Sequence, residues 1–200
     1  MAGYAGNEIV QRLPQDRPCR AAEVGVNTGT TSDVLMARVP GLTLYMVDWW
    51  QPADPDSDYA QTRDSCSKAD ATYFQKAKRI AMARTEFAGE RRIVLHGDCC
   101  AMAEHVPDES LDLVFLDADH SYLGTWDAIM AWARKVRGGG WLGGHDYEPE
   151  TLPAGERRYG VNEAVCGLMS ALNSAGAGAY ALELGADSTW WVRFPAGGAG

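Results

Sequence analysis

Residues Ala21 to Leu35 read AAEVGVNTGTTSDVL, and this stretch decides the fold class. It begins with small and branched apolar residues, turns at Gly25 and Gly29, and continues through Val34 at helical spacing. A buried strand, a tight glycine loop and the first turn of a helix produce this pattern. The stretch therefore predicts an α/β fold in which the loop and the helix start bring backbone N–H groups to a ligand.

The residues around this loop indicate what kind of ligand it binds. Glu23 precedes the first glycine, where a carboxylate would disfavour a pyrophosphate but suit an ammonium group. A second apolar strand, Leu42 to Val47, ends on Asp48, a position suited to accept hydrogen bonds from ribose hydroxyls. Trp49 follows and can stack on an adenine. Together they predict a site for an adenosine with a cationic amino-acid tail. The alternatives are a solvent-facing Glu23 and a tryptophan used for packing.

Four segments resemble one known family. EVGVNTG at 23–29 and VDWW at 47–50 look like the class I S-adenosylmethionine-dependent methyltransferases, and LDLVFLDADHSY at 111–122 and GGHDY at 143–147 strengthen the resemblance. Within that class the chain is similar to bacterial small-molecule O-methyltransferases of natural-product and sugar type, several of which depend on a metal. The resemblance implies a Rossmann-like, mostly parallel seven-stranded sheet with an antiparallel last strand and helices on both faces.

The same resemblance implies S-adenosylmethionine as the cofactor. After the third strand, Asp98 would accept a hydrogen bond from the adenine amine and Cys99 would offer its backbone N–H, although Asp98 could also cap the next short helix. The expected cofactor-binding residues are Glu23, Gly25, Asn27, Gly29, Asp48, Trp49, Asp98, Cys99 and Asp117.

Ionisable side chains follow two further apolar strands, 111–116 and 141–144. The first strand leads to Asp117, Asp119 and His120, and the second leads to His145 and Asp146. Ligands of open α/β sheets bind beyond the carboxyl ends of the strands, so these side chains are expected to converge there.

Two chemistries fit this group. Asp117 and Asp146, with His145 beside them, would bind Mg²⁺ or another divalent metal. Without a metal, Asp119 or His120 would act as the base that deprotonates the acceptor. Asp119 could instead cap the following helix.

The predicted reaction is methyl transfer to an oxygen of a small-molecule acceptor, with or without metal assistance. N-methylation is the alternative within the class. A nucleotide-binding oxidoreductase is disfavoured, because the loop lacks the G-x-G-x-x-G spacing.

Composition limits the partners and the location. The net charge of −9 and the pI near 4.9 argue against a nucleic-acid partner. Five cysteines without metal-type spacing are expected to be reduced thiols in a cytoplasmic protein. No leader and no apolar run of membrane-spanning length is recognised, so no membrane partner is expected. A homodimer is a further expectation.

The 200 residues predict one methyltransferase domain over 1–200. Residues 1–20 are expected to form a helical cover on the cofactor or the sheet, 51–68 and 147–160 to be lid-like loops, and 195–200 to be a flexible tail. The other expected elements are helices at 30–38, 70–87, 122–136 and 160–171, a strand at 92–95, and a closing hairpin at 180–193.

Overall fold

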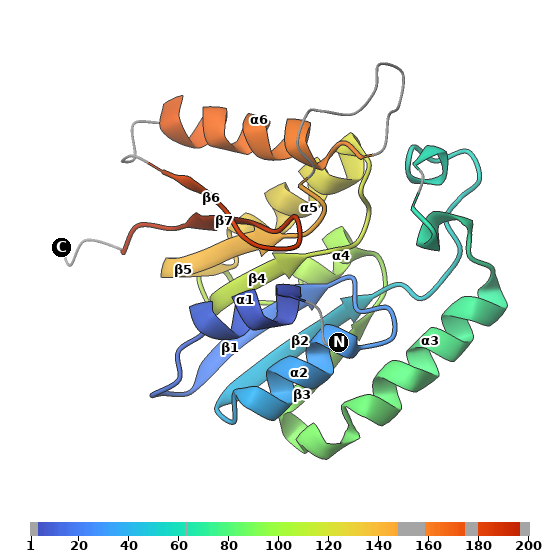
Figure 1. Cartoon of the computed structure of the whole chain (residues 1–200), viewed down its shortest axis with the longest axis horizontal. Coiled ribbons are helices and arrows are strands. Elements are labelled where there is room, and N and C mark those ends of the chain that lie inside the picture. The colour runs from blue at the N-terminus through green and yellow to red at the C-terminus, as the bar shows by residue number, and fades with distance from the viewer. Residues whose placement is uncertain (1–3, 63, 148–158, 175–179, 197–200) are drawn as a thin grey trace.

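The structure is a computed structural model that describes residues 4–62, 64–147, 159–174 and 180–196. Its centre is a seven-stranded sheet in the order β3-β2-β1-β4-β5-β7-β6 (Figure 1). The strands are β1 (Cys19–Val24), β2 (Leu42–Asp48), β3 (Arg92–His96), β4 (Leu111–Leu116), β5 (Val136–Gly144), β6 (Leu182–Leu184) and β7 (Trp190–Arg193). The first five strands pair in parallel, and β7 is antiparallel to both β5 and β6. This confirms the predicted Rossmann-like sheet with its antiparallel last strand.

Helices cover both faces of the sheet and enclose two hydrophobic cores (Figure 1). One face carries α1 (Tyr4–Arg12), α2 (Thr30–Arg38) and α3 (Ala71–Arg84), and the other carries α4 (Cys99–Ala103), α5 (Tyr122–Ala133) and α6 (Val161–Ser174). Side chains alternate between the faces along each strand. In β1, for example, Ala21 packs in the first core, whereas Ala22 and Val24 pack in the second.

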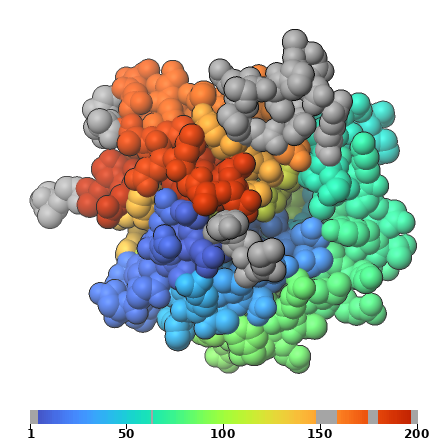
Figure 2. Space-filling view, in the orientation of Figure 1, coloured from blue at the N-terminus to red at the C-terminus, as the bar shows by residue number. Residues whose placement is uncertain are grey.

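The N-terminal helix packs on the sheet. Ile9 and Leu13 are buried in the first core. The Arg12 guanidinium lies 4.3 Å from the centre of the Trp191 ring and 3.5 Å from the Glu183 carboxylate. Figure 2 shows α1, in dark blue, beside the C-terminal strands, in red. Segments from the two ends of the chain thus lie together.

The region between α5 and β5 differs from the prediction. The helix ends at Ala133, and the strand begins at Val136, so the expected helix end at 136 and strand start at 141 are wrong. The three glycines at 138–140 are part of this strand. A Cβ on Gly140 would lie 2.9 Å from the carbonyl oxygen of Asp112 in β4. A glycine at residue 140 therefore allows the two strands to approach closely where their register shifts.

The helix α5 begins at Tyr122, as predicted, but its cap is not the residue offered as the alternative. The Ser121 hydroxyl caps the helix and accepts a hydrogen bond from the Gly124 N–H at 3.1 Å. Asp119 accepts instead from the Ser121 N–H, at 2.7 Å. The helix cap expected at Asp119 is therefore wrong, since a serine in extended conformation already fills that position.

The amino end of β4 is held by a buried carboxylate. The Asp112 side chain is 7% exposed, and its Oδ1 lies 2.6 Å from Arg17 Nη2 and 2.5 Å from Arg137 Nη2. Its Oδ2 accepts a hydrogen bond from the Arg20 N–H at 2.8 Å. This single charge thus ties β1 and β5 to β4 at the edge opposite the predicted site.

The predicted lid-like loops are described only in part. Residues 51–68 contain two short 3-10 helices, Tyr59–Gln61 and Cys66–Lys68, so this stretch has more local structure than its composition indicated. Residues 148–158 of the second loop and 197–200 of the expected tail lie outside the described residues. Among the described helices, none has both the length and the apolar character needed to cross a membrane.

Candidate active site

A cleft of about 1100 Å³ opens at the carboxyl ends of the central strands. It is bounded by the glycine loop, the 51–68 segment and the residues that follow β3 and β4. Eight of the nine predicted cofactor residues line it: Glu23, Gly25, Asn27, Asp48, Trp49, Asp98, Cys99 and Asp117. Gly29 is not among them. The cleft therefore collects most of the predicted cofactor site in one place.

The two glycines of the loop are required by packing within the protein. Both have left-handed backbones, with φ of 97° at Gly25 and 70° at Gly29. A Cβ on Gly25 would lie 1.9 Å from the Asp117 carbonyl oxygen, and a Cβ on Gly29 would lie 2.9 Å from the Ala81 Cα. The loop thus lies directly against the end of β4 and against α3, which fixes its shape.

Asp48 holds this loop on the end of β2. Its Oδ2 accepts hydrogen bonds from the N–H groups of Val26 (2.9 Å) and Asn27 (2.7 Å), and its Oδ1 accepts from Trp50 (2.6 Å). Burial raises the pKa of Asp48, although these bonds favour the ionised form. A carboxylate has about four acceptor sites, so room remains for a further hydrogen bond from the cleft.

Glu23 is buried at the base of the cleft. Its side chain accepts a hydrogen bond from the Ser32 hydroxyl, and the residue is only 3% exposed. The solvent-facing alternative is therefore wrong. Burial raises the pKa of Glu23 to about 8. A carboxyl group in this environment would gain from a cation in the cleft, since an opposite charge favours the ionised form.

The other predicted cofactor residues surround the opening. The side chain of Trp49 is half exposed in the cleft. Asp98 caps α4 by accepting a hydrogen bond from the Ala101 N–H at 2.9 Å, and it lines the cleft as well. The Asn27 side chain accepts from the Tyr73 hydroxyl at 3.0 Å, so it also braces the loop against α3.

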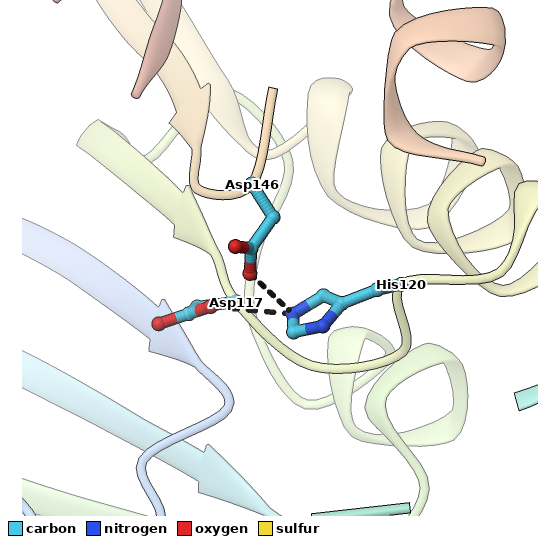
Figure 3. Close-up of side chains that lie close together, drawn as sticks. All are labelled: Asp117, His120 and Asp146. Carbon is cyan, nitrogen blue, oxygen red and sulfur yellow. Dashed lines mark hydrogen bonds and ion pairs between the residues drawn. The ribbon is translucent and has the colours of Figure 1, made fainter. Parts of the chain in front are cut away.

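Three side chains converge where β4 and β5 end. His120 Nε2 lies 3.3 Å from Asp117 Oδ1 and 3.2 Å from Asp146 Oδ2. Figure 3 shows both carboxylates pointing at the imidazole. One potential ligand atom from each residue lies within 4.8 Å of the other two. This trio joins the two predicted metal-binding aspartates to a histidine that was predicted as a base.

The remaining predicted residues lie around this trio. His145 Nδ1 is 3.3 Å from Asp146 Oδ2 and 3.7 Å from Asp117 Oδ1, and its Nε2 is 3.6 Å from Asp187 Oδ2. The predicted ligand His145 thus contacts both aspartates, although His120 supplies the nitrogen of the trio. Asp119 lines the cleft, but its carboxylate lies against the first turn of α5.

The sequence model of a family described as "Methyltransferase domain" matches residues 22–147, well over half of the chain. The chain belongs to this methyltransferase family. The match includes the glycine loop, Asp48, Asp98 and the whole trio. The protein is an S-adenosylmethionine-dependent methyltransferase, as its sequence predicted.

Solved structures share the fold of this methyltransferase at low sequence identity. CalS11, a calicheamicin methyltransferase, is 15% identical with a TM-score of 0.64, over 94% of this chain and 77% of that one. Cofactor-bound Rv0187 from MTB is 15% identical with a TM-score of 0.63, over 98% and 82%. An O-methyltransferase family protein from Burkholderia thailandensis is 16% identical with a TM-score of 0.59, over 96% and 55%. A search of curated proteins finds no match.

One residue of the methyltransferase site was missed by the sequence reasoning. Asp64, in the 51–68 segment, is 8% exposed, lines the cleft and places its Oδ2 3.2 Å from His120 Nδ1. The Tyr59 hydroxyl donates a hydrogen bond to the same carboxylate. No local pattern marks Asp64, because only the folded segment brings it to His120.

The carboxylates around His120 control its charge. Burial opposes the protonated form, but contacts with Asp117 and Asp64 outweigh burial and raise the pKa of His120 to about 10. At Asp64, burial is outweighed by contacts with His120, Tyr59 and the Cys66 N–H, which lower the pKa of this carboxyl to about 2. Asp146 likewise raises the pKa of His145 to about 9. Without another cation, the methyltransferase thus balances several carboxylates with two protonated imidazoles.

Proposed function

We propose that this methyltransferase transfers the methyl group of S-adenosylmethionine to an oxygen of a small-molecule acceptor, assisted by a divalent metal held by Asp117, His120 and Asp146. One observation carries the proposal. Two carboxylates and one imidazole nitrogen, from two different strand ends, lie within 4.8 Å of one another beside the cofactor-sized cleft.

The trio suits a divalent ion in its chemistry and its spacing. Metal ligands lie at about 2.0–2.2 Å from ions such as Zn²⁺ and Mg²⁺, so ligand atoms on either side of one ion are about 4 Å apart. The two distances from His120 Nε2 to the carboxylates, 3.3 Å and 3.2 Å, fall within that reach. Carboxylates suit ions such as Mg²⁺ or Mn²⁺, and an imidazole suits ions such as Zn²⁺ or Fe²⁺, so a divalent ion that accepts both oxygen and nitrogen ligands fits the trio best.

An oxygen acceptor is proposed because of the chemistry that a bound divalent ion would supply. A bound divalent ion polarises a hydroxyl and lowers its pKa. An uncharged amine is nucleophilic without that help, whereas a hydroxyl must lose its proton before or during attack. The trio would therefore hold and orient an acceptor hydroxyl, while Glu23 faces the cofactor ammonium group, Asp48 the ribose and Trp49 the adenine.

The charge of the cleft supports a small acceptor over a nucleic acid. Nine carboxyl side chains line it, and its described lining residues include no lysine or arginine. Nucleic-acid partners are normally bound by basic side chains that neutralise phosphates. The acidic lining of the cleft thus argues against a nucleic-acid acceptor, as does the net charge of −9.

The test is a calorimetric titration of Mn²⁺ and Mg²⁺ into chelator-treated protein saturated with S-adenosylhomocysteine. We expect one ion to bind the wild type and Asp127→Ala, a control that lacks another cleft carboxylate, and none to bind Asp146→Ala. Catechols, vicinal diols and sugars are then compared with the matching amines as acceptors. A wild type that binds no ion would remove the metal, and methylation of amines alone would remove the oxygen acceptor.

A further inference from the structure

The two nitrogens of His120 face different partners. Nε2 is turned toward Asp117 and Asp146, as described above. Nδ1, on the other side of the ring, is inaccessible to solvent and lies at an ion-pair distance of 3.2 Å from Asp64 Oδ2, without the geometry of a hydrogen bond. Among the described residues, Asp64 is the ion-pair partner of this nitrogen. The imidazole thus bridges the trio and the 51–68 segment.

Asp64 is itself held in place. Its Oδ1 accepts a hydrogen bond from the Cys66 N–H at 2.9 Å, and its Oδ2 accepts from the Tyr59 hydroxyl. Its backbone carbonyl accepts from the Ser67 hydroxyl at 2.8 Å. A buried carboxylate with this many partners has a fixed direction, so it can impose a direction on the imidazole next to it.

The His120 ring is also confined by aromatic side chains. Tyr59 meets it edge-on, with ring centres 6.1 Å apart and planes at 88°. Tyr159 approaches with ring centres 4.9 Å apart and planes at 66°. These contacts limit rotation of the ring.

We propose that Asp64 is a positioning residue: it keeps a proton on His120 Nδ1 and aims Nε2 at the Asp117–Asp146 pair, with Tyr59 holding Asp64 in that role. Histidines that bind metals commonly have a carboxylate at their second ring nitrogen, which fixes the tautomer and the ring direction, and the ion pair between Asp64 and Nδ1 places a carboxylate there. The metal affinity of the trio then depends on the 51–68 segment. This inference rests on the proposed function only for its metal measurement.

A purely structural role for Asp64 gives a different expectation. Asp64 accepts from the Cys66 N–H at the start of a 3-10 helix, as a turn-forming aspartate does. Asparagine keeps that acceptor and nearly the same shape but removes the charge. Asp64→Asn therefore separates the positioning of His120 from the stability of the turn.

Asp70 offers a matched control. It caps α3 by accepting a hydrogen bond from the Tyr73 N–H at 2.8 Å, and the structure gives it no contact with His120. In calorimetry with Mn²⁺, Asp64→Asn is expected to bind about 10–100-fold more weakly than the wild type, the usual cost of losing such a carboxylate, and Asp70→Asn to match the wild type within about twofold. Tyr59→Phe should give a smaller loss, because Asp64 keeps its bond to Cys66.

A second measurement uses the metal-free protein. The chain has four histidines, so ring N–H signals can be assigned by NMR with ¹⁵N-labelled histidine. We expect a slowly exchanging Nδ1–H signal from His120 in the wild type and in Asp70→Asn, and its loss or fast exchange in Asp64→Asn. If Asp64→Asn does not fold by circular dichroism, Tyr59→Phe should show faster exchange of the same proton.

The outcomes distinguish this inference from the proposed function. If the wild type binds no Mn²⁺ but the Nδ1–H signal depends on Asp64, the metal is refuted and the positioning role stands. If the wild type binds Mn²⁺ and Asp64→Asn retains both its affinity and its Nδ1–H signal, the positioning role is refuted. An Nδ1–H signal that is absent from the wild type also refutes it.

Discussion

Replacing Glu23 by glutamine should make the cofactor-free protein more stable, and the gain should grow with pH. The Glu23 carboxyl is buried beside Ser32, and its pKa is about 8 instead of the ordinary 4.5. The folded chain therefore holds this proton more tightly than the unfolded chain. Between pH 4.5 and pH 8, the unfolded chain releases this proton, whereas the folded chain must either keep it or ionise a buried carboxyl. The free energy of unfolding therefore falls as the pH rises through this interval.

The size of the effect follows from the two pKa values. One pH unit corresponds to about 1.36 kcal/mol, so 2.5 units between pH 4.5 and pH 7 give about 3 kcal/mol, and the full 3.5 units to pH 8 give about 5 kcal/mol. Water in the open cleft can relax around the charge, so we expect about 2–4 kcal/mol at pH 8. Below pH 4.5, where Glu23 is protonated in both states, the variant and the wild type should be equally stable.

The assay is urea unfolding of the wild type and Glu23→Gln without cofactor, at intervals between pH 4 and pH 9. Glutamine can still accept the Ser32 hydrogen bond, so the comparison isolates the charge. Glu90→Gln, at an exposed carboxylate in the turn after α3, is the control and should track the wild type. A stability difference that is constant with pH, or that shrinks as pH rises, would refute the reasoning.

Two further substitutions test the packing that shapes the site. Gly25→Ala should destabilise the protein by about 3 kcal/mol or more and weaken S-adenosylhomocysteine binding, because its Cβ would overlap the Asp117 carbonyl. Gly139→Ala is the control, since Gly139 also has a positive φ but its nearest neighbour is 4.0 Å away. In urea unfolding this control should cost only about 1–2 kcal/mol. Equal losses would contradict the overlap. Asp112→Ala should cost about 2 kcal/mol, below the usual range for buried pairs because both arginine partners are partly exposed. Calorimetry should show normal cofactor affinity, and a weakened one would contradict a purely structural role.

Most of the fold could be predicted because its signals are local. The glycine loop, the apolar strands and the acids that end them stand within short stretches, and helix 30–38 and strand 111–116 are found at the predicted residues. The prediction failed between α5 and β5, where Gly138 to Gly140 resemble a turn. Glycine normally weakens a strand, but here the close approach of β4 requires it. That requirement belongs to the packed sheet and is invisible in the local sequence.

The residues of the site also divide into those that could be predicted from the sequence and those that depend on tertiary structure. Asp117 and Asp146 could be paired in advance, because the carboxyl ends of neighbouring parallel strands always meet. The choice of His120 over His145 as the third member of the trio depends on how a turn directs each ring, which sequence spacing does not fix. Asp64 lies about 50 residues from Asp117, in a polar segment without periodicity. Only tertiary structure could assign it to the site.

The closing hairpin is more than the end of the sheet. Asp146, Asp187 and Ser188 all have left-handed backbones, a conformation that costs a residue other than glycine about 1–2 kcal/mol. The residues on either side of Asp146 contact the hairpin turn: the Tyr147 N–H donates to the Ser188 carbonyl at 2.9 Å, and His145 lies 3.6 Å from Asp187. Strain of this kind persists only where surrounding contacts hold it. The antiparallel β6–β7 hairpin therefore supports the residues on both sides of Asp146, so the strand that distinguishes this sheet from an all-parallel one also borders the candidate site.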